Sequence, residues 1–319
     1  MQMKPDQRMH PRKKKEAMTE EALHALQGGR RHEGSAGVLY LAGFRYWTAS
    51  VLPAIVGTTL PFWLRPPGFS FRWFGAVEFL IATVLMYSGF SFLHARFERR
   101  ATNEWSESRL LGAAGVCIVV ACLLGLHLSR FTTGGIFIVY GLATLFAGVL
   151  YVVPPFSFSQ RAGGEIVVSM SLSLIPVLGA YLVQTGDLTR TVYLAALPIY
   201  AATGLWVWAG QMVSRSCDEE VGRETLVTVF GARFSGRIAV PVISGALCAT
   251  LLLAVLSASV MPWALTALLS LGLMWRIVSV SWSDYADASQ MLKVRTRAFI
   301  VHLAVCVIIA VSSLAAVFR

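Results

Sequence analysis

A cluster of carboxylates follows one of the long apolar stretches of this chain. The segment Ser214–Leu226 reads SRSCDEEVGRETL, and its four acidic residues are Asp218, Glu219, Glu220 and Glu224. Carboxylates at the boundary of a membrane are costly to place and usually mark a substrate or ion site. Magnesium binds a few carboxylates together with phosphate oxygens and water, so the cluster predicts part of a magnesium and phosphate site. A solvated acidic loop, balanced by Arg215 and Arg223, is an equally good interpretation of the spacing alone.

Spacing singles out Asp218 within this cluster. Residues at i and i+4 share one face of a helix, and Ser214 and Asp218 have that spacing, although only one of them is acidic. Gly222 and Thr225 supply a turn and a helix cap for the segment that follows. We therefore expect Asp218 to lie within a turn or two of the end of the preceding helix, in a polar loop over 214–236.

A second group of polar residues follows the second apolar segment. Its acidic and amide members are Glu98, Asn103, Glu104 and Glu107. Arginines surround them, at positions 96, 99 and 100. These arginines either pair with the glutamates or bind a phosphate group. A cytoplasmic loop with local ion pairs is the competing interpretation.

Two further segments carry charge at predicted helix ends. In Tyr151–Gly164, YVVPPFSFSQRAGG, the double proline ends a helix and Arg161 precedes the next one. Glu165 stands at the start of that next helix, where a carboxylate suits the helix dipole. Asp284 and Asp287 are three residues apart after the eighth apolar segment, and we interpret them as a solvated face.

The composition places these groups in a membrane protein. Of 319 residues, 56% are hydrophobic and 14% are charged, against about 25% charged in soluble domains. The net charge of +10 does not indicate nucleic acid binding, because the basic residues gather in the N-terminal tail and in alternate loops. The five cysteines show no metal-ligand spacing and form no CxxC pair.

Nine apolar segments have about the 20 residues that a helix needs to span a bilayer. We predict spans at about 42–63, 72–94, 110–129, 133–153, 164–184, 191–213, 237–258, 260–280 and 297–318. We expect residues 1–36 to form a basic, flexible tail and 37–319 to form one transmembrane domain. The arginine-rich loops lie on the same side as the tail, so we expect the N-terminus in the cytoplasm and the C-terminus outside.

These segments together resemble the UbiA superfamily of intramembrane prenyltransferases. Within it the chain is most similar to the 1,4-dihydroxy-2-naphthoate polyprenyltransferases of menaquinone synthesis. Three stretches carry the resemblance: FRYWTASVLPAIVGT from Phe44, with Arg45, Pro53 and Gly57; YVVPPFSFSQRAGGEIVVSMSLSLIPVLGAYLVQTG from Tyr151; and DEEVGRETLVTVFG from Asp218.

The resemblance implies an all-α integral membrane protein, with nine transmembrane helices in a bundle around a central cavity. It also implies a bacterial cytoplasmic membrane. Two aspartate-rich motifs at the cytoplasmic side would hold Mg²⁺ and the diphosphate of a polyprenyl donor. Loss of the diphosphate gives an allylic cation that alkylates an aromatic quinone precursor, while the metal and arginines neutralise the leaving group.

The sequence departs from the family pattern in both motifs. The first motif falls on His94, Ala95, Glu98 and Thr102, so that only Glu98 is acidic. A shifted alignment reads Asn103-Glu104-Trp105-Ser106-Glu107 as the motif. In the second motif Ser214 replaces the first aspartate and Asp218 keeps the second.

The resemblance assigns roles to seven residues. Glu98 and Asp218 are the expected catalytic carboxylates, and both are expected metal ligands. Glu104 and Glu107 are further candidate ligands of Mg²⁺. The diphosphate is expected to contact Arg161, Arg223 and Arg45.

Two other functions remain open on the same fold. The protein could bind an isoprenoid or quinone lipid, or serve as a partner in a biosynthetic complex, without ionising diphosphates. It could also cyclise a terpene. A transporter is less favoured, because the chain shows no repeated half.

Overall fold

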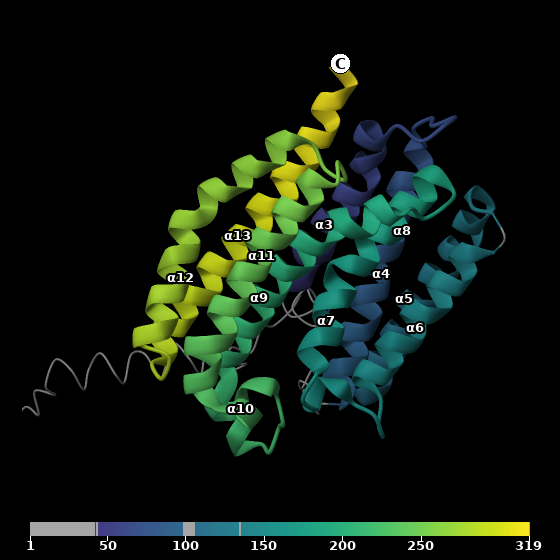
Figure 1. Cartoon of the computed structure of the whole chain (residues 1–319). Helices are drawn as coiled ribbons and strands as arrows, with labels where there is room; N and C mark the ends of the chain where they lie inside the picture. Colours follow the sequence, from purple (N-terminus) through teal and green to yellow (C-terminus); the bar gives the residue numbers. More distant parts are fainter. Residues whose placement is uncertain (1–41, 43, 98–105, 134, 319) are drawn as a thin grey trace, which may run out of the picture.

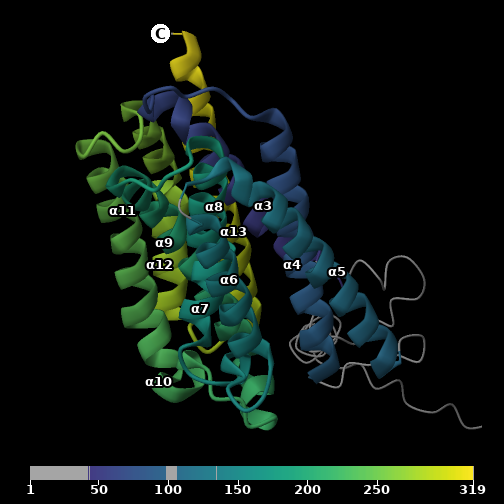
Figure 2. The ribbon, with the colours of Figure 1, turned by 90° about the vertical axis from the view of Figure 1, so that its right-hand side faces the viewer.

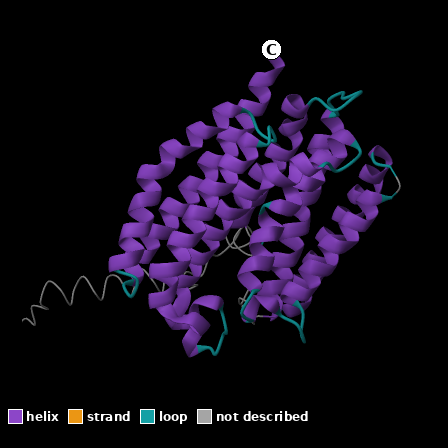
Figure 3. Ribbon diagram, viewed as in Figure 1, coloured by secondary structure: helices purple, strands orange, loops and turns teal. Residues whose placement is uncertain are grey.

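The computed structural model describes residues 42, 44–97, 106–133 and 135–318, and all regular structure within them is helical (Figures 1 and 3). The predicted basic tail over 1–36 lies outside the described residues. The α-helices are α3 (Phe44–Leu64), α4 (Trp73–Phe97), α5 (Glu107–Leu128), α6 (Ile136–Val152), α7 (Gly164–Leu172), α8 (Leu174–Thr185), α9 (Arg190–Glu220), α10 (Leu226–Phe234), α11 (Val240–Leu256), α12 (Leu271–Ser283) and α13 (Ala288–Ala315). A π-helical turn, Ser235–Ala239, joins α10 to α11, and short 3₁₀ helices cover Ser129–Phe131, Phe158–Gln160, Pro262–Ser270 and Ala316–Phe318.

The described chain forms an integral membrane helical bundle, as the sequence predicts. Eight helical stretches are long and apolar enough to cross a bilayer, and α6 is a shorter apolar helix of 17 residues. Together they fall at the nine predicted spans. Connections alternate between the two ends of the bundle, so the turns before α7, α10 and α13 lie at one end and the C-terminus lies at the other (Figure 1).

Three predicted boundaries are wrong in the same direction. α9 continues to Glu220, so Ser214 and Asp218 lie within the helix and not in a loop. The next helical stretch begins at Leu226 instead of 237, and the last begins at Ala288 instead of 297. Hydropathy misses these turns because they are polar, but local contacts stabilise them as helix. Thr225 forms a capping box at the start of α10, and Asp287 accepts hydrogen bonds from the first backbone N–H groups of α13.

α9 forms the centre of the bundle. Its small residues Ala195, Ala202 and Ala209 are fully buried, which lets neighbouring helices approach closely. Helices α3, α7, α8, α11 and α13 pack around it. α4 and α5 lie on one side of this core and α11 on the other (Figure 2).

The fifth span is broken between α7 and α8. Ser173 has φ −127° and ψ −68°, and Pro176 has no N–H to continue the hydrogen-bond ladder. The hydroxyl of Tyr87 donates to the carbonyl of Ser171, and that of Tyr140 donates to the carbonyl of Ile175. The neighbouring helices α4 and α6 therefore satisfy backbone groups near the break, as a membrane interior requires.

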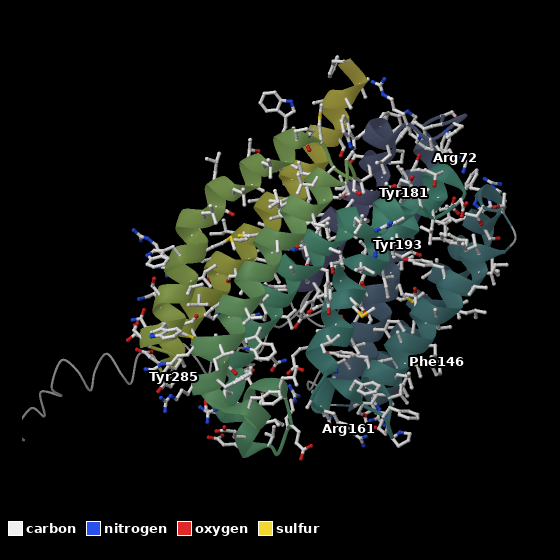
Figure 4. All side chains as sticks on the ribbon, in the orientation of Figure 1. Arg72, Phe146, Arg161, Tyr181, Tyr193 and Tyr285 are labelled. Carbon is white, nitrogen blue, oxygen red and sulfur yellow. The ribbon has the colours of Figure 1, made fainter. Side chains whose placement is uncertain are left out.

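The end of the bundle opposite α10 is held by buried polar contacts. The Gln184 side chain accepts from the Arg72 backbone N–H at 3.0 Å and donates to the Arg72 carbonyl at 3.2 Å. The Arg72 guanidinium donates to the carbonyls of Phe131 and Val183, both at 2.8 Å, and is labelled in Figure 4. The segment before α4, the 3₁₀ turn after α5 and the end of α8 therefore meet at this one residue.

Candidate diphosphate and metal site

Asp218 is the centre of the candidate site. It lies in the last turns of α9 and is only 4% exposed. Ser214 Oγ donates to Asp218 Oδ2 at 2.7 Å, and the Arg223 guanidinium lies 3.4 Å from Oδ1. A carboxylate buried at this depth needs such partners, because an uncompensated charge is costly to desolvate. The i and i+4 spacing predicted for Ser214 and Asp218 is confirmed by this hydrogen bond.

A tight turn brings Arg223 back toward the helix that precedes it. Gly222 has φ 70°, a left-handed conformation that favours glycine. The Arg223 backbone N–H donates to the Asp218 carbonyl at 2.7 Å. The backbone of the turn and the guanidinium thus both contact Asp218, so the residue at 223 is fixed beside the carboxylate.

Glu165 is a second buried carboxylate next to Asp218. It is 5% exposed, and its charge lies near enough to Asp218 for the two to interact. Its Oε1 accepts from the Leu226 backbone N–H at 2.8 Å, and its Oε2 accepts from the Gly163 N–H at 3.2 Å. Sequence reasoning assigned Glu165 only to the dipole of its own helix. The structure adds that it also satisfies the N-terminus of α10, and so joins α7 to the turn after α9.

Arg161 borders a polar hollow beside these carboxylates. The hollow has a volume of about 380 Å³ and includes Pro155, Arg161 and Glu224 in its lining. The Glu224 backbone N–H donates to the Gln160 carbonyl at 3.1 Å, which fixes the two loops against each other. The Arg161 guanidinium donates to the Pro155 carbonyl at 2.9 Å and is exposed (Figure 4). The structure therefore brings Arg161 and the Asp218–Arg223 turn to neighbouring loops.

The other predicted site residues are Glu98, Glu104, Glu107 and Arg45. Glu107 begins α5, is 56% exposed at its side chain and pairs with Arg96 at 2.7 Å, which is the local ion pair of the competing interpretation. Glu98 and Glu104 lie outside the described residues. Arg45 belongs to α3, but its side chain also lies outside the description.

α9 carries two further polar side chains that the sequence reasoning missed. Gly204, Trp208 and Gln211 are spaced three or four apart and so share one face of the helix, and Gly204 packs near Ser169 of α7. Trp208 Nε1 and Gln211 Oε1 are buried, and neither is hydrogen-bonded to any described group. The signal in the sequence was Gln211, a polar residue within an apolar segment three residues before Ser214.

The comparisons with known proteins agree with this arrangement. The model of the UbiA prenyltransferase family matches residues 93–303, about two thirds of the chain. The chain belongs to the UbiA prenyltransferase family. The matched region contains Asp218, Arg223, Glu165 and Arg161. No curated protein sequence matches this UbiA-family chain.

Solved structures share the fold at low sequence identity. A UbiA homologue from Archaeoglobus fulgidus bound to Cd²⁺ is 14% identical with a TM-score of 0.64, over 88% of this chain and 99% of the homologue. The same homologue bound to GPP and Mg²⁺ has a TM-score of 0.59 at 13% identity, over 88% and 99%. A digeranylgeranylglyceryl phosphate synthase has a TM-score of 0.66 at 11% identity, over 87% and 98%. These likenesses establish the UbiA fold for the chain.

The donor set is suited to a magnesium ion that arrives with a phosphate. Among the described residues, no three His, Cys, Asp or Glu side chains form a metal-binding group. Magnesium commonly takes one or two carboxylates and completes its shell with substrate phosphate oxygens and water. Asp218 fits that pattern as a single protein carboxylate. Arg223, already beside it, fits the phosphate oxygens.

Proposed function

We propose that this chain is a membrane prenyltransferase that moves a polyprenyl group from its diphosphate to an aromatic quinone precursor. The acceptor we propose is 1,4-dihydroxy-2-naphthoate, in a bacterial cytoplasmic membrane, with the tail and the α10 end of the bundle in the cytoplasm. The observation that carries the proposal is the buried Asp218–Arg223 pair at the end of a membrane-spanning helix. A family relative with the same fold binds GPP and Mg²⁺, which supports this choice of donor.

In this proposal Arg223 and Arg161 contact the diphosphate oxygens, and Arg45 approaches from α3. Asp218 is the carboxylate available to Mg²⁺, with Glu98, Glu104 and Glu107, which follow α4 in the sequence, as further candidate ligands. Ser214 keeps Asp218 oriented through its hydrogen bond. The bound metal ion would neutralise charge that develops on the leaving diphosphate.

The reaction balances without a further reagent. The bond between the allylic carbon and its oxygen breaks, and its electron pair leaves on the diphosphate. An aromatic carbon then forms the new bond to the prenyl chain. The ring afterwards expels a proton, or carbon dioxide where the attacked carbon carries a carboxylate. Arginine side chains at the diphosphate stabilise the charge that appears in the first step.

The test is Mg²⁺-dependent transfer from a polyprenyl diphosphate to 1,4-dihydroxy-2-naphthoate by the purified full chain, with diphosphate release measured in parallel. We expect R223Q and D218N each to lower the rate by roughly 10²-fold, a usual loss when one charge-stabilising group is removed. R233Q and D284N are matched controls, since both residues are exposed, and they should retain activity. Wild-type protein that releases no diphosphate would overturn the proposal. Unchanged activity in R223Q and D218N would overturn the residue assignment.

One observation favours a second candidate, a UbiA-fold protein that binds an isoprenoid or quinone lipid without ionising diphosphates. Asp218 is already bonded to Ser214 and paired with Arg223, so its charge is balanced without a metal. This candidate predicts a co-purified isoprenoid lipid and no diphosphate release. The same release assay therefore separates the two functions.

A further inference from the structure

A separate cavity lies within the membrane-spanning part of the bundle. It has a volume of about 300 Å³ and is enclosed by α4, α5, α6 and the break between α7 and α8. Along α4 its lining runs from Phe79 to Phe90. The eleven residue steps between them correspond to about 16 Å at 1.5 Å per residue. The cavity is therefore long and narrow, and it runs along the direction in which lipid chains lie.

The cavity opens toward the bilayer between α5 and α6. Leu126 of α5 and Leu142 of α6 both line the cavity and are exposed at the surface, by 57% and 61%. Ile138, also in the lining, is 42% exposed. These helices form one edge of the bundle, where Phe146 of α6 points outward (Figures 1 and 4). A hydrocarbon chain in the surrounding bilayer can therefore enter sideways.

The hydroxyl groups in the cavity wall are already used by the backbone. Tyr87 and Tyr140 donate to carbonyls near the α7–α8 break. Thr83 Oγ1 donates to the Phe79 carbonyl at 2.8 Å, and Thr144 Oγ1 donates to the Tyr140 carbonyl at 2.9 Å. These four groups have no remaining proton to donate to a ligand. The wall suits an apolar ligand, because it gives a polar one little compensation for lost hydration.

The cavity is closed toward the end of the bundle that holds Asp218. The ring of Phe90 packs directly on Gly148, where a Cβ atom would collide with it. α7 contributes Ser171 to the cavity wall and packs on α9, whereas α9, which carries Asp218, contributes no residue to the lining. None of the residues that line the cavity belongs to the candidate diphosphate site. The opening between α5 and α6 gives a chain from the bilayer direct access to it.

We propose that this cavity binds one acyl chain of a bilayer phospholipid, which enters between α5 and α6. The chain would fill the space beside Tyr87 and the helix break. This site is separate from the proposed diphosphate site, and its occupancy needs no turnover. The proposal therefore stands or falls independently of the transferase activity.

Photolabelling in nanodiscs tests the proposal. Full-length protein is reconstituted with phosphatidylcholine that carries a diazirine on one acyl chain, and labelled residues are mapped by mass spectrometry. We expect labelling at Tyr87 in the cavity and at Ile81, which is 50% exposed on the same helix and reports ordinary contact with bilayer lipid. The ratio of labelling at Tyr87 to that at Ile81 is the measured quantity.

Three glycines provide matched variants. Gly125 and Gly141 line the cavity, and an added Cβ meets only a Phe137 ring atom at 3.9 Å in the first and nothing within 4 Å in the second. G125L and G141L should fill the cavity and lower the ratio by roughly tenfold, because a packed interior leaves no room for a chain. Gly115 lies on α5 outside the cavity, with nothing within 4 Å, so G115L should leave the ratio unchanged.

Several outcomes would overturn the proposal. One is that Tyr87 is not labelled in the wild-type protein. Another is that the ratio of labelling at Tyr87 to that at Ile81 is the same in G125L, G141L and G115L. Another is a photoactivatable polyprenyl diphosphate that labels Tyr87 and displaces the phospholipid probe, since the occupant would then be a prenyl chain. If the leucine variants fail to fold, native mass spectrometry of wild type decides the question. One phospholipid should survive stepwise detergent washing, and complete loss of lipid would contradict the site.

Discussion

Replacing Ser214 by aspartate tests the electrostatics of the candidate site directly. Ser214 Oγ donates to Asp218 Oδ2 at 2.7 Å, and Asp218 is 4% exposed. S214D removes that hydrogen bond, which is worth about 1.5–3 kcal/mol when one partner is charged. It also places two carboxylates about 4 Å apart, where their repulsion is about 4 kcal/mol at an effective dielectric constant of 20. Arg223 offsets part of this cost, so we expect a net loss of roughly 4 kcal/mol without divalent ions.

Magnesium should reverse this loss if the two positions face a common ion. An ion bound between the carboxylates contributes about 2.7 kcal/mol at a concentration 100-fold above its dissociation constant. In the presence of a chelator, the Tm of S214D should lie roughly 10 °C below that of wild type. This shift follows because each kcal/mol of lost stability lowers Tm by about 2–4 °C. Titration with Mg²⁺ at constant ionic strength should recover much of the difference, and it should move the Tm of wild type less.

A matched control lies on the same end of the bundle. Ser283 Oγ donates to Asp284 Oδ2 at 2.6 Å, but both residues are exposed. S283D should change Tm little, with or without Mg²⁺, because exposed charges are screened by water. The reasoning is refuted if S214D matches wild type in chelator, or if Mg²⁺ raises the Tm of S214D no more than that of S283D.

Three further predictions use the same thermal assay. The Ser289 hydroxyl holds the pKa of Asp287 below its ordinary value of 3.8, so the ionised cap stabilises α13 above that pH and the contribution is lost as pH falls through the lowered pKa. D287A should therefore cost about 1 kcal/mol at pH 7 and less as the pH falls through the lowered pKa; a cost that does not change with pH would contradict the ionised cap. G57A should cost more than about 4 kcal/mol, because its Cβ would collide with a backbone carbonyl of α8, whereas G112A adds a methyl group in open space. Y87F should cost about 1–3 kcal/mol by leaving a carbonyl at the α7–α8 break without its donor, and an unchanged Tm would show that the carbonyl finds another partner.

The number and type of helices follow from the sequence because length and hydropathy decide them. A segment of about 20 apolar residues has no stable alternative to a helix in lipid. The polar ends are different, since hydropathy treats them as loops. The turns around Ser214 and Asp218 are helical because i and i+4 contacts support them, including the Arg215–Glu219 pair at 2.8 Å.

The candidate site could be predicted only where its partners are close in sequence. The Ser214–Asp218 contact follows from helix geometry, and the Arg223 contact needs only a short turn at Gly222. Glu165 is 53 residues from Asp218, and no periodicity indicates that the two meet. Packing of α7 on α9 brings them together, and packing is not a local property.

The charge balance of the site explains why serine is acceptable at position 214. Asp218 and Arg223 neutralise each other at the membrane boundary, which lowers the cost of burying either one. A second aspartate at 214 would leave an excess negative charge in the absence of metal, whereas the serine hydroxyl stabilises the one carboxylate that remains. A diphosphate that arrives with Mg²⁺ would offer each member of this ion pair a new partner. The phosphate oxygens suit Arg223, and the metal ion suits Asp218. In the proposed function this ion pair holds Arg223 where an incoming diphosphate would need it, and it balances the charge of Asp218 when no diphosphate is bound.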